Sequence, residues 1–442
     1  MKKQDKGLTV FSLTMMALGT VIGGSFFLGS GISIYNSGPG VILAYILGGL
    51  LVAFILFALS EMTVADPNSG SFRAFAEHAF GKGMGFTIGW VYWTGLVLAM
   101  SSEAVAVSTF IRLWFPNLSI PLLGTIVIVF ITLINLLGTN KLSLLENGLA
   151  SIKLLTIVGF IVIATYLIFG LGKDVSPVGL GALKNEALFP YGFKGIAGSM
   201  LIIIFTYAGF EIIGLAASET PNPHHVIPKT IVFTVITLVG LYTISTLTLL
   251  PLISTNKLST EESPFVLALN NHNIFWAGKV MNLIMVTAIF STMLAATFGL
   301  ARMLRSLADE GYAFKFLKDQ GDIPYRGIIF SGLAMLFAFS MSFVLPSKIY
   351  VFLVSSGGFA FLFTYLIIVS SHLKFRKKNG CPPKGKCQLP LYPYSSWISI
   401  IMLIIIIISM PFVKGQALGL IAGIGLLLFY FIIYLILRKK LN

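Results

Sequence analysis

The sequence predicts an all-α membrane protein with twelve transmembrane helices, because of its composition and its long apolar runs. Of the 442 residues, 56% are hydrophobic and only 10% are charged, whereas a soluble domain averages about 25% charged residues. A transmembrane helix needs about 20 mostly apolar residues, and many runs in this chain reach that length. Transmembrane β-strands would show alternating polarity over short segments, a pattern that this sequence lacks.

The predicted helices follow one another with short polar connections. They cover residues 8–33, 39–60, 84–113, 119–138, 147–171, 192–217, 229–252, 275–306, 327–345, 348–373, 395–413 and 416–437. Since no connection is long enough to fold by itself, residues 1–442 are expected to form one transmembrane domain.

The formal net charge of +14 is explained by membrane topology. With the N-terminus in the cytoplasm, twelve spans place most of the 30 Lys and Arg residues in inner segments, above all in 302–326 and 374–386. Cytoplasmic loops of membrane proteins carry such an excess. We therefore expect cytoplasmic N- and C-termini, a surrounding lipid bilayer and no nucleic-acid partner.

The two cysteines, Cys381 and Cys387, lie in "CPPKGKC" on a predicted inner loop. Because the cytoplasm is reducing, they are expected to be free thiols. Two isolated cysteines are a weak sign of a metal or redox site, and so are His224 and His225 in another inner loop. We expect no metal and no cofactor.

Two predicted helices, the first and the sixth, contain residues that interrupt a helix. "GTVIGGSFF" places Gly19, Gly23 and Gly24 close together, and "FTYAGFE" carries a glycine and an acid; glycine is a poor helix former. If residues 8–171 and 192–373 are two halves of five spans each, the broken helices take equivalent places. Because each half has an odd number of spans, the two halves run through the membrane in opposite directions. Helices 11 and 12, residues 395–437, lie outside this repeat.

A broken helix in lipid needs a reason, because each unpaired N–H or C=O group costs several kcal/mol. Freed N–H groups suit a carboxylate, and freed carbonyls suit an ammonium or a cation. Two breaks that face each other could therefore hold a zwitterionic amino acid. The alternative is that the glycines only permit close helix packing.

Three charged residues lie well inside predicted spans, away from their ends, where a charge costs about 2.5–3.5 kcal/mol. Glu211 is either functional, as a ligand, gate or proton site, or a hydrogen-bonding partner of the nearby break. Lys153 either reaches the interface or is a buried ammonium that can release a proton or replace a metal cation. Glu103 either supports a break or lines a pocket, whereas Glu61 and Glu146, near helix ends, are expected at the interface.

Several stretches resemble one known family. "GTVIGGSFFLGSG" with "SEMTVADPNSGSFRAFAEHAFGKGMGFTIGWVYW" resembles the first part of bacterial amino acid permeases of the amino acid–polyamine–organocation superfamily. "FTYAGFEIIGLAASETPNPHHVIPKTI" resembles the sixth span and following loop of the amino acid transporter branch, and "ARMLRSLADEGYAFKFL" resembles its eighth span. The resemblance covers about residues 8–330 and implies a five-plus-five inverted repeat with discontinuous helices 1 and 6.

The resemblance also implies which residues form the substrate site. The candidates are Val21, Gly23, Gly24, Ser25, Met100, Glu103, Phe205, Thr206, Ala208, Gly209 and Ala296. The first-helix residues would contact the substrate carboxylate, with Ser25 where the family motif has glycine. Carbonyls near Phe205 and Thr206 would receive the ammonium, and Phe205 would cover the site.

The implied function is proton-coupled import of an amino acid across the plasma membrane by alternating access. Lys153 falls where proton-coupled members carry a lysine, and Glu211 would support the sixth-helix break. The alternatives are an exchanger without net proton flux and a non-transporting amino acid sensor. An enzyme is not expected, and the sequence has no GxxxxGK[ST] motif for an ATP-driven pump. Apolar pocket walls favour a neutral amino acid, although Glu103 could accept a cationic one.

Overall fold

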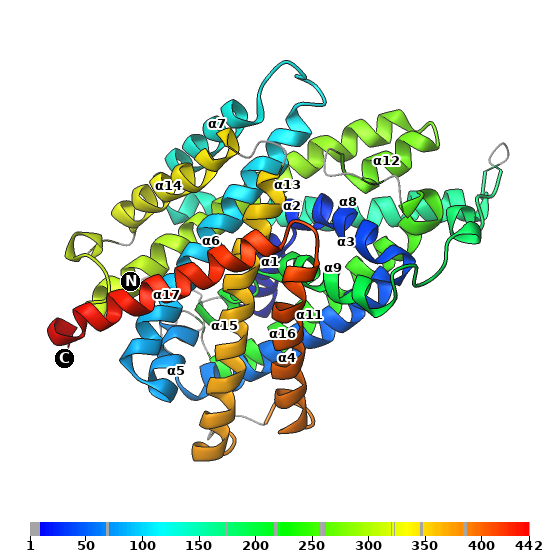
Figure 1. Ribbon diagram of the computed structural model, residues 1–442. Coiled ribbons are helices and arrows are strands. Elements are labelled where there is room, and N and C mark those ends of the chain that lie inside the picture. Colours follow the sequence, from blue (N-terminus) through cyan, green and yellow to red (C-terminus); the bar gives the residue numbers. More distant parts are fainter. Residues whose placement is uncertain are drawn as a thin grey trace, which may run out of the picture.

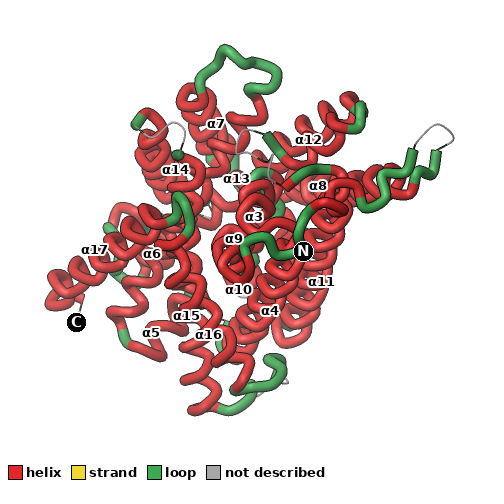
Figure 2. The backbone as a smooth tube through the Cα atoms, turned by 45° about the vertical axis from the view of Figure 1, so that its right-hand side comes forward, coloured by secondary structure: helices red, strands yellow, loops and turns green. Residues whose placement is uncertain are grey.

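The long helices of the computed structural model overlap the predicted ranges, and two further helices, Ser71–Phe80 and Pro264–Asn271, were not predicted (Figure 1). The structure describes residues 9–67, 70–172, 176–215, 220, 222–255, 258, 262–319, 321, 323–344, 348–382 and 387–441. The regular secondary structure of these residues is helical, and loops and turns connect the helices, as Figure 2 shows. The predicted all-α class is confirmed.

The helices are as follows in chain order. They are α1 (Val10–Val21), α2 (Gly24–Phe27), α3 (Gly29–Ser37), α4 (Val41–Ala65), α5 (Ser71–Phe80), α6 (Lys82–Ile111), α7 (Ile120–Asn135), α8 (Thr139–Phe169), α9 (Gly192–Tyr207), α10 (Ile212–Leu215), α11 (Pro223–Leu249), α12 (Pro264–Asn271), α13 (Phe275–Asp309), α14 (Tyr325–Ser340), α15 (Ile349–Asn379), α16 (Tyr394–Ser409) and α17 (Ala417–Leu441). Short 3₁₀ turns are η1 (Gly38–Gly40), η2 (Gly181–Asn185), η4 (Leu250–Leu252), η6 (Lys315–Leu317), η7 (Met341–Phe343) and η8 (Met410–Phe412).

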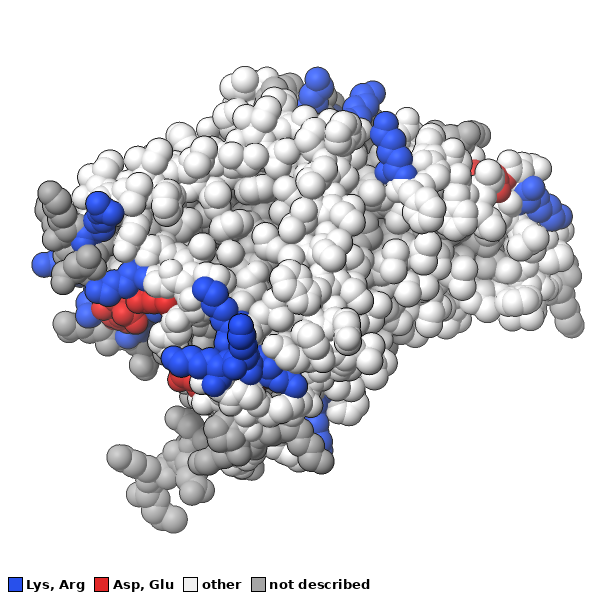
Figure 3. All heavy atoms as spheres, turned by 60° about the horizontal axis from the view of Figure 1, so that its bottom comes forward, with Lys and Arg blue, Asp and Glu red and all other residues white. Residues whose placement is uncertain are grey.

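The length and composition of these helices indicate a membrane protein. Among the described residues, ten helical stretches are long and apolar enough to cross a membrane, while α1 and α7 are apolar but shorter. Figure 3 shows a broad uncharged surface, with Lys and Arg gathered in separate places on that face. The exposed side chains of α16 and α17 include many large hydrophobic residues, as expected of helices that face lipid.

The interior of the bundle is formed around α6, which packs against α5, α7, α13, α14, α15 and α17. The first helix, α1, packs against α8, α11 and α13. The short segment α2 contacts α6, α9 and α13. Residues far apart in sequence therefore meet where α1 gives way to α2.

The first and sixth predicted helices are interrupted at their glycines. Helix α1 ends at Val21 and α2 begins at Gly24, with extended backbone at Gly23. Helix α9 ends at Tyr207, and α10 begins four residues past Ala208, after Gly209, whose φ of +111° favours glycine. The breaks fall at Gly23 and Gly209, whereas Gly19 lies inside α1 and Gly24 is the first residue of α2.

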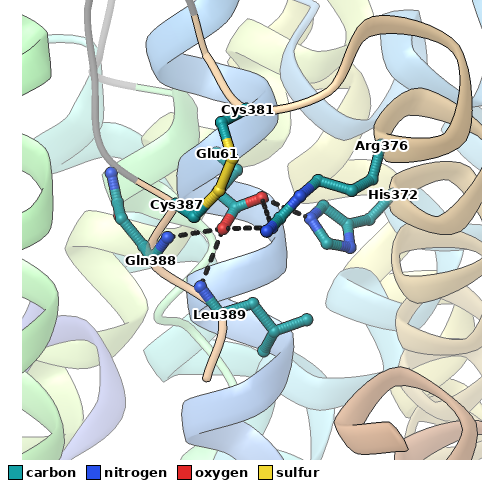
Figure 4. Close-up of a disulfide and its surroundings, with 7 residues drawn as sticks. All are labelled: Glu61, His372, Arg376, Cys381, Cys387, Gln388 and Leu389. Carbon is teal, nitrogen blue, oxygen red and sulfur yellow. Dashed lines mark hydrogen bonds and ion pairs between the residues drawn. A yellow bond between two sulfur atoms is a disulfide. The ribbon is translucent and has the colours of Figure 1, made fainter. Parts of the chain in front are cut away.

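Glu61, expected near the membrane interface, lies close to the end of α4, and its side chain is fully buried within the protein. Arg376 Nη1 donates to Glu61 Oε2 at 2.6 Å, and His372 Nε2 lies 2.7 Å from the same oxygen. The amides of Gln388 and Leu389 donate to Glu61 Oε1 (Figure 4). The loop after α15 folds back over the end of α4. The place of Glu61 near a helix end in the sequence gives no sign of this contact. The side chain of Glu146 lies outside the described residues.

The expectation of free thiols at Cys381 and Cys387 is wrong, because their two sulfur atoms are bonded to each other. The Cα atoms of the two cysteines lie 5.2 Å apart, beside Glu61 and its hydrogen-bond partners (Figure 4). The expectation rested on the redox state of one compartment, whereas the returning loop brings the two cysteines together.

Candidate functional site

A small cavity lies between the two helix breaks. Its volume is about 50 Å³. It is lined by Thr20, Val21, Ser25, Tyr92, Leu96, Ala99, Met100, Glu103, Phe205, Ala208, Gly209, Ile212, Thr292, Ala295, Ala296, Gly299 and Phe361. The lining is mostly apolar, with backbone, hydroxyl and carboxylate groups at the breaks, as is typical of a site for a small polar ligand.

The N–H groups freed by the first break are bound by Glu103, a buried residue in the middle of α6. The Gly24 amide donates to Glu103 Oε2 at 2.6 Å, and the Ser25 amide donates to Oε1 at 3.0 Å. A Cβ atom on Gly24 would lie 2.8 Å from both Glu103 Oε2 and the Cβ of Ala106. Glycine is therefore required here by the close approach of α6.

The carbonyl groups freed by the same break face a buried ammonium. Lys153 Nζ, from α8, donates to Gly19 O at 2.6 Å and to Thr292 Oγ1 at 2.8 Å. Thr292 Oγ1 in turn lies 2.9 Å from Ile22 O, to which it donates. The Lys153 side chain is fully buried, so it does not extend to the interface.

The second break is bound by Glu211 from the same segment. The Gly209 amide donates to Glu211 Oε2 at 2.9 Å, and Tyr365 of α15 donates its hydroxyl to Oε1. Thr20 Oγ1 donates to Gly209 O at 3.3 Å, so the last turn of α1 contacts the second break. Acids and hydroxyls thus satisfy backbone groups that the breaks expose in the interior.

Most of the predicted substrate-site residues surround this cavity. Those in its lining are Val21, Ser25, Met100, Glu103, Phe205, Ala208, Gly209 and Ala296. Gly23, Gly24 and Thr206 do not line it. The Thr206 hydroxyl donates to Ile203 O at 2.7 Å, and Lys153 and Glu211 lie behind the cavity wall, each bonded to a break.

Several lining residues escaped the sequence reasoning. Thr292 lies four residues before Ala296, and Ala99 four residues before Glu103, so helical spacing from the predicted residues could have found both. Phe361 comes from α15, in which no residue was predicted to reach the site. Only the packing of α15 against α6 and α9 brings Phe361 there.

No set of three or more His, Cys, Asp and Glu side chains that could hold a metal occurs in the part of the chain that the structure describes. At the first break, a carboxylate binds two amides and an ammonium binds a carbonyl, so groups of both charges lie beside the cavity.

Comparison with known proteins identifies the family. The family model described as amino acid permease matches residues 12–441. The chain belongs to the amino acid permease family. The permease resembles the gamma-aminobutyric acid permease of Bacillus subtilis (strain 168), with 34% identity over 98% of this chain and 94% of that protein. It is 30% identical to the aromatic amino acid transport protein AroP of Escherichia coli O157:H7, over 94% and 91% of the two chains.

Solved structures show the same fold at low sequence identity. A manganese transporter from Eremococcus coleocola, in complex with an aromatic bis-isothiourea substituted compound, superposes with a TM-score of 0.57 and 13% identity over 98% of the permease and 95% of that chain. The resemblance read from the sequence is confirmed by the family match. The permease is therefore a membrane transporter of amino acids and not an enzyme.

Proposed function

We propose that this permease imports an amino acid together with a proton across the plasma membrane by alternating access. It would use twelve spans, with residues 8–171 and 192–373 as inverted repeats, residues 395–437 as two further helices, and both termini in the cytoplasm. The observation that carries the proposal is the buried ammonium of Lys153 at the first break.

The position of Lys153 supports proton coupling through its chemistry. Its ammonium lies where the Gly19 carbonyl and the Thr292 hydroxyl converge, and such oxygen ligands would also suit a metal cation. An ammonium supplies a comparable charge but can lose it by releasing a proton. Loss of that charge would loosen the contact between α8 and the end of α1, so protonation and the shape of the first break would be linked.

The cavity supports the amino acid as the other transported species. Val21, Ser25 and Ala208 bring backbone of both breaks to it, and Met100 and Ala296 give it apolar walls. We assign the substrate carboxylate to the first break, at Gly23, Gly24 and Ser25. We assign the ammonium to the carbonyls near Phe205 and Thr206, with Phe205 as the aromatic cover and Gly209 and Glu211 shaping the second break.

The direction in which the cavity extends supports an inward-facing state. Along α6 its lining runs from Glu103 to Tyr92, and along α13 it runs from Thr292 to Gly299. Both directions lead toward Lys82 and Asp309, the helix ends next to the basic segments that we assign to the cytoplasm. Substrate and proton would then be released on that side.

The test is uptake by proteoliposomes under an imposed pH gradient, first with a panel of the common L-amino acids and 4-aminobutyrate. The wild type is expected to accumulate one of them when the outside is acidic. Lys153→Ala is expected to lose this accumulation and to keep part of its exchange activity. Thr156→Val, a change on the same helix α8 whose hydroxyl bonds only its own turn at Ile152 O, serves as the control.

Three results would contradict the proposal. If Lys153→Ala accumulated the amino acid at the wild-type level under a pH gradient, Lys153 would have no role in proton coupling. Wild-type uptake that responds to amino acid inside the vesicles and not to pH would indicate an exchanger. Binding without any uptake would indicate a sensor.

A further inference from the structure

We propose that Glu103 is an internal competitor of the transported amino acid. Its carboxylate occupies the two amides of the first break that the substrate carboxylate would use, so it must leave them before the substrate binds. This inference rests on the proposed function, and it assigns to Glu103 a regulating role in the same site. The sequence left two roles open for Glu103, support of a helix break and a place in the pocket lining, and neither included competition with the substrate.

The geometry of the contact carries the inference. Each oxygen of Glu103 accepts from one amide, Gly24 at 2.6 Å and Ser25 at 3.0 Å. Charge-assisted hydrogen bonds of this kind are about twice as strong as neutral ones. The two parallel donors select a carboxylate, and the one already present belongs to the protein.

The surroundings show that the contact is built into the fold. Glu103 is only 3% exposed, and Gly24 lacks the Cβ atom that would meet Glu103 Oε2 at 2.8 Å. Ser25 and Glu103 both line the cavity between the breaks, so a ligand in the cavity is next to the bond that it has to replace. Competition of this kind makes the empty site stable without leaving two buried amides unpaired.

If Glu103 competes with the substrate, replacing Glu103 changes the substrate affinity in one direction; if Glu103 contacts the substrate directly, the affinity changes in the opposite direction. When a site is open for only a fraction of the time, its apparent affinity falls by that fraction. Weakening the internal ligand should therefore tighten substrate binding. If Glu103 instead held the substrate, the same change would weaken binding.

The first experiment measures the dissociation constant of purified wild type, Glu103→Gln and Glu103→Asp for the transported amino acid from the uptake panel. Glutamine carries no charge and cannot accept with two oxygens, and aspartate is too short to keep both contacts. We expect binding to become tighter by about fivefold or more in both variants. The amine that corresponds to this amino acid without its carboxylate should gain nothing. Unchanged or weaker binding of the amino acid would overturn the inference.

The control variant is Glu186→Gln. Glu186 also accepts a backbone amide, from Thr255 at 2.9 Å, but it lies on the loop after η2 and does not line the cavity. Its affinity for the amino acid should equal that of the wild type. A gain as large as that of Glu103→Gln would show that the effect is not local and would contradict the proposal.

The second experiment does not depend on knowing the substrate. Hydrogen exchange of the peptide that contains Gly24 and Ser25 is measured with and without sodium acetate. In Glu103→Gln we expect faster exchange, which acetate slows, while the wild type is insensitive to acetate. Equal exchange in both proteins without an acetate effect would overturn the inference. If the wild type transports no amino acid, the proposed function fails, and the exchange result still decides whether Glu103 occupies a carboxylate site.

Discussion

The two helix breaks satisfy their backbone groups in different ways. At the first, the carboxylate and the ammonium come from other helices, Glu103 from α6 and Lys153 from α8. At the second, the acid comes from the break itself, because Glu211 binds the Gly209 amide two residues away. The first break thus depends on charged side chains of two other helices, whereas the second takes its acid from its own segment and only hydroxyl donors from α1, α11 and α15.

This difference indicates which break changes during transport. A break held by side chains from α6 and α8 responds to any shift of these helices and to any change in the charge of Glu103 or Lys153. A break held by its own segment keeps its shape more easily, with Tyr365 as its partner on α15. We therefore expect the first break to couple proton and substrate, and the second to act as a comparatively fixed wall of the site.

The largest effect on uptake is predicted for a substitution that fills the space at Gly24. Its added Cβ atom would lie 2.8 Å from Glu103 Oε2 and from Ala106, and 2.9 Å from Ile289 Cδ1. Gly24→Ala should reduce uptake by about tenfold or more, because overpacking a tight interior costs about 1–3 kcal/mol. Gly159→Ala on α8, where an added Cβ meets nothing within 4 Å, is the control. Equal uptake by the two variants would show that close contact at the first break is not needed.

The local character of the second break is tested at Glu211. Glu211→Gln removes the charge that both Gly209 and Tyr365 bind, and should reduce uptake by about tenfold, since a hydrogen bond to a charged group contributes about 1.5–3 kcal/mol. Tyr365→Phe keeps the Gly209 contact and should have a smaller effect. Initial rates of uptake measure both. If Tyr365→Phe were the more damaging change, the second break would depend on α15 and not on its own acid.

The contact between the breaks predicts the smallest effect. Thr20→Val removes a hydroxyl that donates to Gly209 O at 3.3 Å and to Ala17 O at 2.9 Å. We expect uptake to fall by about two- to fivefold, the cost of one hydrogen bond between neutral groups. A loss larger than that of Glu211→Gln would mean that the two breaks act as one unit, which would contradict the distinction drawn between them.

The sequence predicted the all-helical class and the place of both breaks, but not the short helices α5 and α12. Glycine within an apolar run and charge at mid-span are local signals, and they located Gly23, Gly24, Glu211 and Lys153. The family resemblance added Val21, Phe205 and Ala296. These features could be predicted because membrane helices follow directly from local composition.

The partners across the fold could not be predicted from local patterns. The contact of Glu103 with Gly24 joins residues 79 positions apart, and Phe361 reaches the cavity only through the packing of α15. Glu61 is buried by a loop more than 300 residues away, a contact that its place near a helix end does not indicate. Such contacts depend on tertiary structure, and no spacing rule within one segment describes them.

Proton movement during uptake tests the central claim most directly. Wild-type proteoliposomes that contain a pH-sensitive dye are given the transported amino acid from outside, without any imposed gradient. Coupled import through the Lys153 site predicts acidification of the interior in step with amino acid entry, and its loss in Lys153→Ala. Entry of the amino acid into wild-type vesicles with no change of internal pH would contradict the account.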